Sequence, residues 1–459
     1  MKTGIVKPRT LSGFMELLPK EQLVFDQIRH TLSEVYRQYG FLPLDTPVLE
    51  HSEILLTKSG GETEKQIYRF SKGDTDLTMR FDLTVPLAKY VAKNYSALTF
   101  PFRRYQIGKV YRGERAQKGR FREFYQSDID IIGDGSLALM NDAEIPSIIY
   151  DIFHRLGLND FTIRINNRKV LTGFFSMLGL DEKAEGIMRV VDKLEKIGKD
   201  AVLKELEELG VSKEQCEKIL HFISFKGSNE ETIAFLNSLK EDNELFALGA
   251  EELEFVTTAI KAYGVPEENF HIDLTIARGL DYYTGTVYET SFNKHPEIGS
   301  ICSGGRYENL AGYYTEKQLP GVGISIGLTR LFYILNERNY LRDDTCAPSD
   351  VLVIPMTEDV APSIRIASEL RKFDIHTQIY FEKKKFKAKI GYADKLSIPF
   401  AIFLGEDELA ANKVALKNLS TGEQQVLPLE EAISVIKNTL SEKENATIIH
   451  TELTSVTHS

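Results

Sequence analysis

The feature that most constrains the fold of this chain is a long helical stretch enclosed by two stretches with strand character. Residues 168–264 are rich in charge and carry apolar side chains at spacings of three and four, the pattern of amphipathic helices. Short strand-like segments precede this stretch, from about 64 to 133, and follow it, from about 270 to 328. A helical block between two strand blocks predicts an α+β domain with a helical insertion.

A second domain is predicted in the last quarter of the chain. Two uninterrupted apolar runs, 351–354 and 400–404, have the composition of parallel strands that are buried on both faces. A helical pattern and a third strand-like segment lie between these runs, so the sequence predicts a small α/β domain over about 347–440. The tail, 441–459, is polar, and we expect it to be loosely held.

Composition and charge exclude several classes of protein. The 459 residues allow roughly two to four domains, and 56 basic against 67 acidic side chains give a net charge of −11. This balance argues against a generally basic nucleic-acid coat but is compatible with a local basic groove. No apolar run has the length of a membrane span or of a signal-peptide core, and the three cysteines lie far apart without metal-ligand spacing. We therefore expect a cytoplasmic protein without a membrane span or a protein-bound metal.

A strongly basic hairpin stands out against the acidic background. Residues 101–126 hold eight Arg or Lys and two Glu. Alternation along the second strand places Phe124, Gln126, Asp128 and Asp130 on one face. An aromatic ring, an amide and two carboxylates on one face of a core strand indicate a small-molecule site, and the nearby arginines suit a polyphosphate. The alternative is a solvated, charged hairpin.

A glycine-bearing strand lies in residues 320–335. Val322, Ile324 and Ile326 alternate with glycine and serine, so one face is apolar and the other nearly bare. Such a face indicates either a ligand close to the backbone or a tightly packed helix. Arg330 falls in the first turn of the following helix, where an anion would satisfy both the guanidinium and the helix end.

An arginine-bearing turn interrupts the strand pattern after residue 276. Arg278 is followed by Tyr282 and Tyr283, and the segment 303–307, Ser-Gly-Gly-Arg-Tyr, lies downstream. An aromatic pair beside an arginine suits a flat, partly polar ligand. The alternative is two core tyrosines and a surface arginine.

Taken together, these segments resemble the histidyl-tRNA synthetases, a family of class II aminoacyl-tRNA synthetases, over roughly residues 8–435. The helix and the proline-bearing strand that end at Pro47 are similar to the class II dimerisation motif. The hairpin 104–132 is similar to the second class motif, and 321–330 to the third. The segments 278–283 and 303–307 resemble the histidine-specific signals and occur in the expected order.

The resemblance implies an α+β catalytic domain built on an antiparallel sheet, with a helical insertion and a C-terminal α/β anticodon-binding domain. The implied bounds are 1–328 for the catalytic domain with its insertion at 168–264, 329–346 for a connecting helix and linker, 347–440 for the anticodon-binding domain and 441–459 for the tail. The implied function is that of a histidine–tRNA ligase, which activates L-histidine with ATP to histidyl adenylate and pyrophosphate and then transfers histidine to the 3′ end of tRNA(His). A homodimer, and Mg²⁺ bound through the ATP phosphates, are implied as well.

The resemblance also assigns the ATP-binding residues. Arg112 should hold the α-phosphate, with Arg278 opposite it, in a place where related enzymes use a metal ion. Glu114 should lie near the adenine, and Phe124 and Arg330 should sandwich the adenine ring. The implied catalytic set is Arg278, Arg112 and Gln126.

The implied histidine-binding residues are polar or aromatic side chains of four segments: Asp82, Thr84, Gln126, Asp130, Tyr282, Tyr283 and Tyr307. Asp82 and Thr84 should take the α-amino group, and Gln126 should lie beside the carboxylate and the α-phosphate. Asp130 and Tyr283 should bind the imidazole, and the other two tyrosines should line its pocket. Some relatives carry Glu where this chain has Asp82 and Asp130, so the acid remains but is one methylene shorter.

A run of lysines lies in the C-terminal domain. Lys383, Lys384, Lys385, Lys387 and Lys389 occur within seven residues. By likeness to the family this domain binds the tRNA anticodon, and the lysines are the candidate contacts. The alternative is a solvated helix start.

Two other functions compete with this one. A non-catalytic relative, such as the regulatory subunit of ATP phosphoribosyltransferase, usually lacks the RNA-binding domain and loses site arginines, whereas this chain keeps Arg112, Arg278 and Arg330. The second is a synthetase-like domain that serves only as an RNA-binding module. Histidine-dependent exchange of pyrophosphate into ATP separates both from an enzyme.

Overall fold

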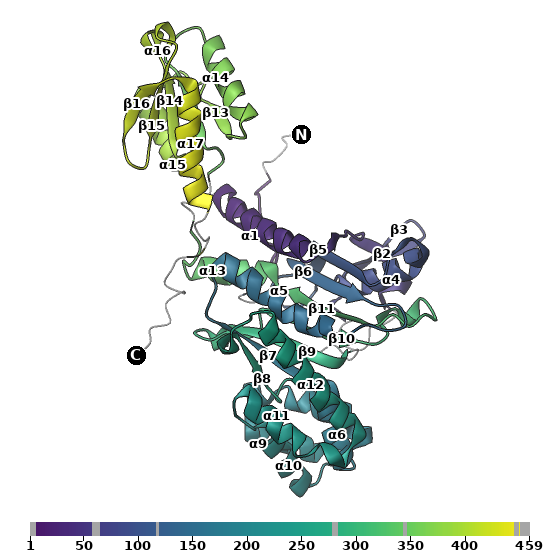
Figure 1. The fold of residues 1–459 in the computed structure, drawn as a ribbon. Helices are drawn as coiled ribbons and strands as arrows, with labels where there is room; N and C mark the ends of the chain where they lie inside the picture. The colour runs from purple at the N-terminus through teal and green to yellow at the C-terminus, as the bar shows by residue number, and fades with distance from the viewer. Residues whose placement is uncertain are drawn as a thin grey trace. The chain divides into compact units, whose positions relative to one another are not determined.

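The computed structural model describes residues 6–56, 65–115, 119–277, 283–342, 347–444 and Ile449. The chain divides into two compact units (Figure 1). Of the described residues, the larger unit holds 6–16 and those of 29–338, and the smaller unit holds 17–28 and those of 339–452. No helix among the described residues is both long enough and apolar enough to cross a membrane.

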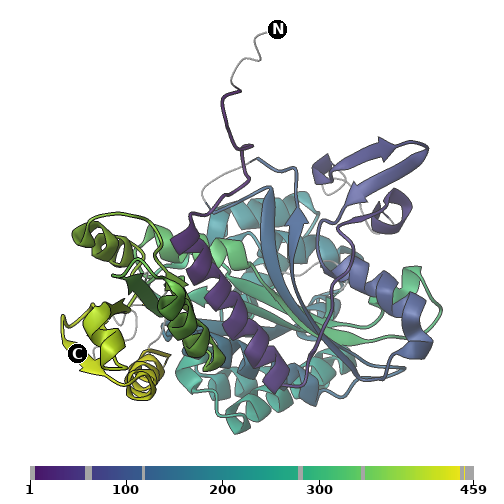
Figure 2. The same ribbon diagram turned by 90° about the horizontal axis from the view of Figure 1, so that it is seen from above.

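An eight-stranded sheet organises the described part of the larger unit (Figure 2). Its strands, in spatial order, are β1 (Leu42–Pro43), β5 (Phe102–Tyr111), β6 (Glu123–Ile132), β11 (Gly321–Ile326), β10 (Cys302–Tyr307), β9 (Tyr283–Phe292), β7 (Phe161–Asn167) and β8 (Phe270–Ile272). Neighbouring strands are antiparallel except at the two edges, where β1 pairs with β5 and β7 with β8 in parallel. The prediction of an α+β fold on an antiparallel sheet is therefore confirmed.

The remaining elements of the larger unit, apart from the insertion, include a three-stranded sheet in the order β2, β4, β3. These strands are β2 (Leu49–His51), β3 (Arg69–Lys72) and β4 (Thr75–Met79). The helices are α1 (Pro19–Gln38), whose first half falls in the smaller unit, α2 (Ser52–Leu56), α4 (Thr84–Asn94), α5 (Met140–Leu156) and α13 (Leu328–Glu337). Short 3₁₀ helices, of which η2 and η3 fall inside the insertion, are η1 (Tyr95–Ala97), η2 (Asp181–Lys183), η3 (Lys240–Asp242), η4 (Glu267–Asn269), η5 (Pro296–Ile298) and η6 (Leu310–Tyr313).

The helical block forms between strands β7 and β8, as the sequence predicts. It consists of α6 (Arg168–Met177), α7 (Ala184–Val191), α8 (Leu194–Ile197), α9 (Lys199–Glu208), α10 (Lys213–Ile223), α11 (Asn229–Asn237) and α12 (Glu244–Ala262). Glycines let α6 and α12 approach closely, since a Cβ on Gly173 would lie 2.5 Å from the backbone nitrogen of Phe246. Helix α12 also packs on α5 and on strands β7 and β9, which joins the insertion to the sheet.

The smaller unit contains a five-stranded sheet with helices. The strands, in spatial order, are β13 (Thr377–Ile379), β12 (Val351–Pro355), β14 (Phe400–Leu404), β15 (Val414–Asn418) and β16 (Gln424–Leu427). The helices are α14 (Ala361–Lys372), α15 (Phe386–Lys395), α16 (Glu406–Ala410) and α17 (Leu429–Glu444). Every residue of β12 and β14 is buried, with Val351 and Val353 in one apolar cluster and Leu352 and Ile354 in another. The α/β prediction for this region is thus confirmed.

Candidate active site

A cavity of about 560 Å³ lies in the larger unit and gathers residues from several separate segments. Its wall includes these residues assigned from the sequence: Asp82, Thr84, Arg112, Glu114, Phe124, Gln126, Tyr283 and Arg330. Asp128 and Ser325 lie in the same wall. The structure therefore brings four of the residues proposed for ATP and four of those proposed for the amino acid into one wall.

A larger hollow of about 1040 Å³ borders this cavity. It extends toward the helical insertion and is lined by residues such as Arg164 and Glu195. Glu289, Ser300 and Arg330 belong to both walls, so the two spaces adjoin. Of the residues assigned from the sequence, Arg330 is the one that the described wall of this larger hollow includes.

Arg112 follows directly on β5 and is held by aromatic contacts. Its guanidinium carbon lies 4.4 Å from the ring centre of Phe81 and 5.1 Å from that of Phe124. Its Nε donates to the carbonyl oxygen of Phe81 at 3.2 Å. These contacts fix the plane of the guanidinium in the cavity wall, beside the ring proposed to stack on adenine.

Arg330 lies in the first turn of α13 and is anchored by carbonyl groups. Its Nη1 donates to the carbonyl of Ser300 at 3.2 Å, and its Nη2 donates to the carbonyl of Ile298. The interpretation from the sequence placed an anion at this arginine. In the structure, backbone carbonyls supply part of the negative charge that the guanidinium needs.

Asp82 is oriented by the start of helix α4. Its Oδ1 accepts backbone N–H groups of Thr84, at 3.1 Å, and Val85, at 2.9 Å. Because the helix start holds one carboxylate oxygen, the side chain has a defined direction in the cavity wall.

Asp130 forms a buried pair with Arg104. Arg104 Nη2 lies 2.6 Å from Asp130 Oδ2, and the hydroxyl of Tyr307 donates to Oδ1 at 3.0 Å. Burial raises the pKa of Asp130 to about 6, although the charge of Arg104 opposes this shift. Neither Asp130 nor Tyr307 lines the 560 Å³ cavity, because both are buried within the sheet.

The bare face of the glycine strand accommodates these two side chains. A Cβ on Gly323 would lie 2.4 Å from Asp130 Oδ1, and a Cβ on Gly321 would lie 2.5 Å from the Tyr307 ring. The sequence left a ligand and a packed helix as alternatives for this face. In the structure, protein side chains of the proposed imidazole pocket occupy it.

Two residues at the site, Arg104 and Asp128, were not assigned from the sequence. Arg104 faces Asp130 across the β5–β6 pair, and Asp128 faces Ser325 across the β6–β11 pair. The alternation that placed Asp128 beside Gln126 was the available signal for Asp128. Arg104 could have been found only from the register of the hairpin, which pairs it with Asp130. The sequence does not fix that register, because the loop between the two strands is long.

The described wall of this cavity does not account for the remaining assigned residues. Arg278 and Tyr282 lie outside the described residues. The lysines belong to the smaller unit, where Lys383, Lys384, Lys385 and Lys387 are exposed at the start of α15. Lys389, further along this helix, donates through Nζ to the carbonyl of Pro355 at 3.3 Å.

Family models match nearly the whole chain. Residues 13–331 match the model described as "Histidyl-tRNA synthetase", and residues 350–439 match the one described as "Anticodon binding domain". The chain belongs to the histidyl-tRNA synthetase family.

Several members of the family are similar over their full length. The histidine–tRNA ligase of Clostridium tetani is 58% identical, over 95% of this chain and 100% of the relative. That of Finegoldia magna is 48% identical, over 94% of this chain and 100% of the relative. The solved histidyl-tRNA synthetase from Nostoc sp. PCC 7120 has a TM-score of 0.88 and 41% identity, over 95% of this chain and 100% of that structure.

These matches confirm that the chain is an enzyme, a histidine–tRNA ligase that uses ATP. A solved structure from Bacillus halodurans C, named as an ATP phosphoribosyltransferase regulatory subunit/histidyl-tRNA synthetase, has a TM-score of 0.70 at 21% identity. It covers 86% of this chain and 99% of its own, and at this identity it shows a shared fold.

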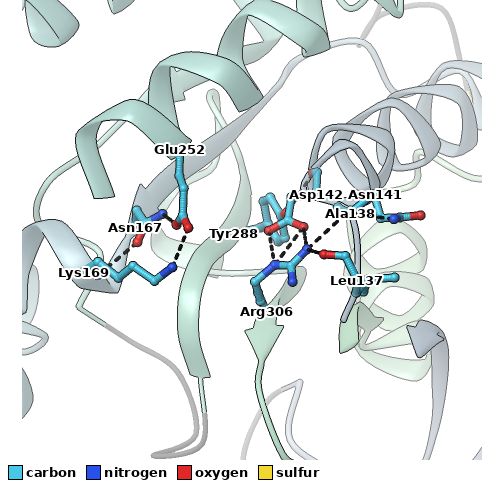
Figure 3. Close-up of polar contacts among 9 residues, drawn as sticks. All are labelled: Leu137, Ala138, Asn141, Asp142, Asn167, Lys169, Glu252, Tyr288 and Arg306. Carbon is cyan, nitrogen blue, oxygen red and sulfur yellow. Dashed lines mark hydrogen bonds and ion pairs between the residues drawn. The ribbon is translucent and has the colours of Figure 1, made fainter. Parts of the chain in front are cut away.

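In this synthetase the segment 303–307 is held to helix α5 by side-chain hydrogen bonds (Figure 3). Arg306 donates to both carboxylate oxygens of Asp142 on α5, at 3.0 Å from Nε and 2.6 Å from Nη2. Tyr288 donates to the Asp142 carbonyl at 2.7 Å. Arg306 therefore joins β10 to α5, and this attachment fixes the strand that carries Tyr307.

A second polar cluster in Figure 3 holds the start of the insertion. Asn167 accepts the backbone N–H of Lys169 as the cap of α6, and its Nδ2 donates to Glu252 at 2.8 Å. Lys169 pairs with the same carboxylate. Because Glu252 lies in the middle of α12, these contacts tie that helix to the start of α6.

Proposed function

We propose that the 560 Å³ cavity binds ATP and L-histidine together and forms histidyl adenylate. The observation that supports this most is the shared wall: Arg112, Phe124 and Arg330 lie in one cavity with Asp82 and Gln126. Nucleotide and amino acid bound there would meet near Gln126. The adenylate then transfers histidine to the 3′ end of tRNA(His).

The nucleotide half of the proposal assigns Arg112 to the α-phosphate and Glu114 to the adenine. Phe124 and Arg330 take the two faces of the adenine ring. The contacts of Arg112 with Phe124, and of Arg330 with backbone carbonyls, support this because they hold both side chains in place before ATP binds. Arg278 is assigned opposite Arg112 by likeness to the family alone.

The first step requires positioning and neutralisation of charge. The histidine carboxylate attacks the α-phosphorus, a new carboxyl–phosphate bond forms, and pyrophosphate leaves. Arginines on the α-phosphate offset the charge of the transition state, and no protein acid or base is needed. Mg²⁺ would enter on the β- and γ-phosphates, because it prefers oxygen ligands shared with the substrate.

The amino-acid half assigns Asp82 and Thr84 to the α-amino group and Asp130 with Tyr283 to the imidazole. Tyr307 donates a hydrogen bond to Asp130, and this bond supports a pocket built from buried polar side chains. A buried polar pocket of this kind discriminates by about 10⁴-fold or more against analogues that lack the matching groups.

The smaller unit is proposed to bind the anticodon of tRNA through its exposed lysines, Lys383 to Lys387, with Lys389 as a weaker contributor. We also propose the domain bounds given above, a homodimer formed through the segment that ends at Pro47, and a cytoplasmic location. The dimer rests on the similarity of that segment to the class II dimerisation motif.

The test is exchange of labelled pyrophosphate into ATP, with each of the twenty amino acids supplied alone. Exchange with histidine and not with the others is expected. Exchange without an amino acid preference would contradict the proposed pocket. Binding of tRNA without any exchange would favour the RNA-binding module instead.

A further inference from the structure

Two buried hydrogen-bond acceptors in the cavity wall have no partner among the described residues. They are Oε1 of Gln126 and Oδ1 of Asp128, and both atoms are inaccessible to solvent. Asp128 as a whole is 2% exposed. Buried polar atoms are nearly always hydrogen-bonded, so two orphan acceptors in one wall call for an explanation.

The neighbouring groups leave these two atoms to a ligand. Gln126 Nε2 donates to the hydroxyl of Ser325 at 3.1 Å, and Ser325 faces Asp128 in the β6–β11 register. Arg104 reaches the backbone carbonyl of Asp128 at 3.4 Å but gives its ion pair to Asp130. The carboxylate of Asp128 therefore lacks a cation of its own.

The register of β6 places the two acceptors side by side. Residues two apart on a strand point to the same face, about 7 Å apart along the chain. Asp82 is the third acceptor of this group, and its negative charge acts on Asp128. Two carboxylates and an amide oxygen thus belong to the wall of the same cavity.

We propose that Asp128 is a further histidine-binding residue, whose Oδ1 accepts a hydrogen bond from the α-ammonium group beside Asp82 and Gln126. An ammonium group has three N–H donors, and the wall offers three acceptors. The inference rests on the proposed function, because it requires histidine to bind in this cavity.

The chemistry of Asp128 favours the ammonium group over the imidazole. A desolvated carboxylate gains most from a full positive charge, through a charge-assisted hydrogen bond. The imidazole has an ordinary pKa of about 6.5 and is mostly neutral at pH 7. Asp130, further along the same strand, already has Tyr307 and Arg104 and is assigned to the imidazole.

The experiment compares wild type with Asp128→Asn in the full-length protein. Inhibition constants for pyrophosphate exchange are measured with L-histidinol, which keeps the ammonium group, and with 3-(imidazol-4-yl)propionate, which lacks it. KM values for histidine and for ATP are measured alongside. Glu123→Gln is the matched control, since it lies on the same strand, pairs with Lys109 and is outside the cavity wall.

We expect Asp128→Asn to raise KM for histidine and the inhibition constant of histidinol by on the order of tenfold or more, the scale of a lost charge-assisted bond. The inhibition constant of the propionate and the KM for ATP should each change less than threefold. Equal weakening of both inhibitors would assign Asp128 to the imidazole and overturn the proposal. An unchanged KM for histidine would overturn it too, whereas absence of exchange by wild type would contradict the proposed function itself.

Discussion

The guanidinium of Arg104 and the carboxylate of Asp130 form an ion pair that is removed from solvent, with Nη2 and Oδ2 2.6 Å apart. The side chain of Arg104 is 0% exposed and that of Asp130 is 7% exposed. The two residues face each other across the β5–β6 hairpin. A strand of the basic hairpin thus supplies the counter-ion for the carboxylate that is proposed to bind imidazole.

Replacing Arg104 by Met should destabilise the larger unit by about 3–5 kcal/mol, because it leaves a buried carboxylate without its cation. The measurement is the free energy of unfolding in denaturant. Adding Asp130→Asn should recover part of the loss, since the amide removes the unpaired charge. A single variant as stable as wild type would show that the ion pair is dispensable for folding.

Asp128 should make the stability of the free protein depend on pH. Burial raises the pKa of Asp128 to about 7, with Asp130 and Asp82 adding to the shift and Arg104 and Ser325 opposing it. In the unfolded chain the carboxyl has its ordinary pKa of about 3.9. Between these values the folded state binds more protons than the unfolded state, so stability falls as pH rises from about 4 to 7.

Asp128→Asn should remove the contribution of Asp128 to this dependence, while that of Asp130 remains, and should stabilise the free protein at pH 8. Its advantage over wild type should grow between pH 5 and pH 8 by on the order of 2–3 kcal/mol. Unfolding of both proteins at the two pH values, without histidine, measures it. If the free energies of unfolding of the two proteins change equally between pH 5 and pH 8, ionisation of Asp128 does not destabilise the folded protein.

The sequence predicted the elements whose hydrophobic period is strong. The insertion expected at 168–264 begins with α6 and ends with α12, and the buried runs 351–354 and 400–404 form β12 and β14. The antiparallel strands β15 and β16 were not predicted. Residues 424–426 in β16 are exposed. Strand β16 therefore lacks the apolar pattern by which a buried strand is recognised in a sequence.

The assignment of the candidate site came from motif resemblance more than from physical pattern, and it stays a prediction. In the sequence, Arg104 is one of eight basic residues of a hairpin that suits phosphate. In the structure it is fully buried and forms an ion pair with Asp130. Composition cannot tell which face of a strand a charge occupies, and its partner depends on the register. The bare glycine face was recognised, but the side chains that fill it come from β6 and β10.

Gly323→Ala should disrupt the imidazole pocket. The added Cβ would lie 2.3 Å from the carbonyl oxygen of Ile129 and 2.4 Å from Asp130 Oδ1, so the strand pairing must shift. We expect a lower melting temperature and a KM for histidine raised by tenfold or more. Gly327→Ala is the control for stability, since its Cβ would meet Arg330 Cβ at 3.8 Å, an ordinary contact. Equal melting temperatures and equal KM values for histidine in the two variants would contradict the predicted clash at Gly323.

Arg112→Ala and Arg278→Ala should each lower the rate of adenylate formation by on the order of 10²–10³, the scale of losing a positioned charge at a reacting group. Histidine-dependent pyrophosphate exchange is the measurement. Arg69→Ala serves as control, because Arg69 lies in the three-stranded sheet and pairs with Asp76. A loss below threefold in either variant would refute the catalytic role of that arginine.

Reversing the charge of Lys383, Lys384 and Lys387 to Glu should weaken binding of tRNA(His). The three side chains are exposed, whereas Lys389 is bonded to a carbonyl and is left unchanged. If each lysine contacts one phosphate, the slope of log affinity against log salt should flatten by about 2–3. Pyrophosphate exchange should stay at the wild-type rate, because adenylate formation does not involve tRNA. Reversal of three other exposed lysines of this unit, Lys372, Lys413 and Lys437, controls for net charge. An equal loss of affinity in both triple variants would show that overall charge, and not this segment, carries the binding.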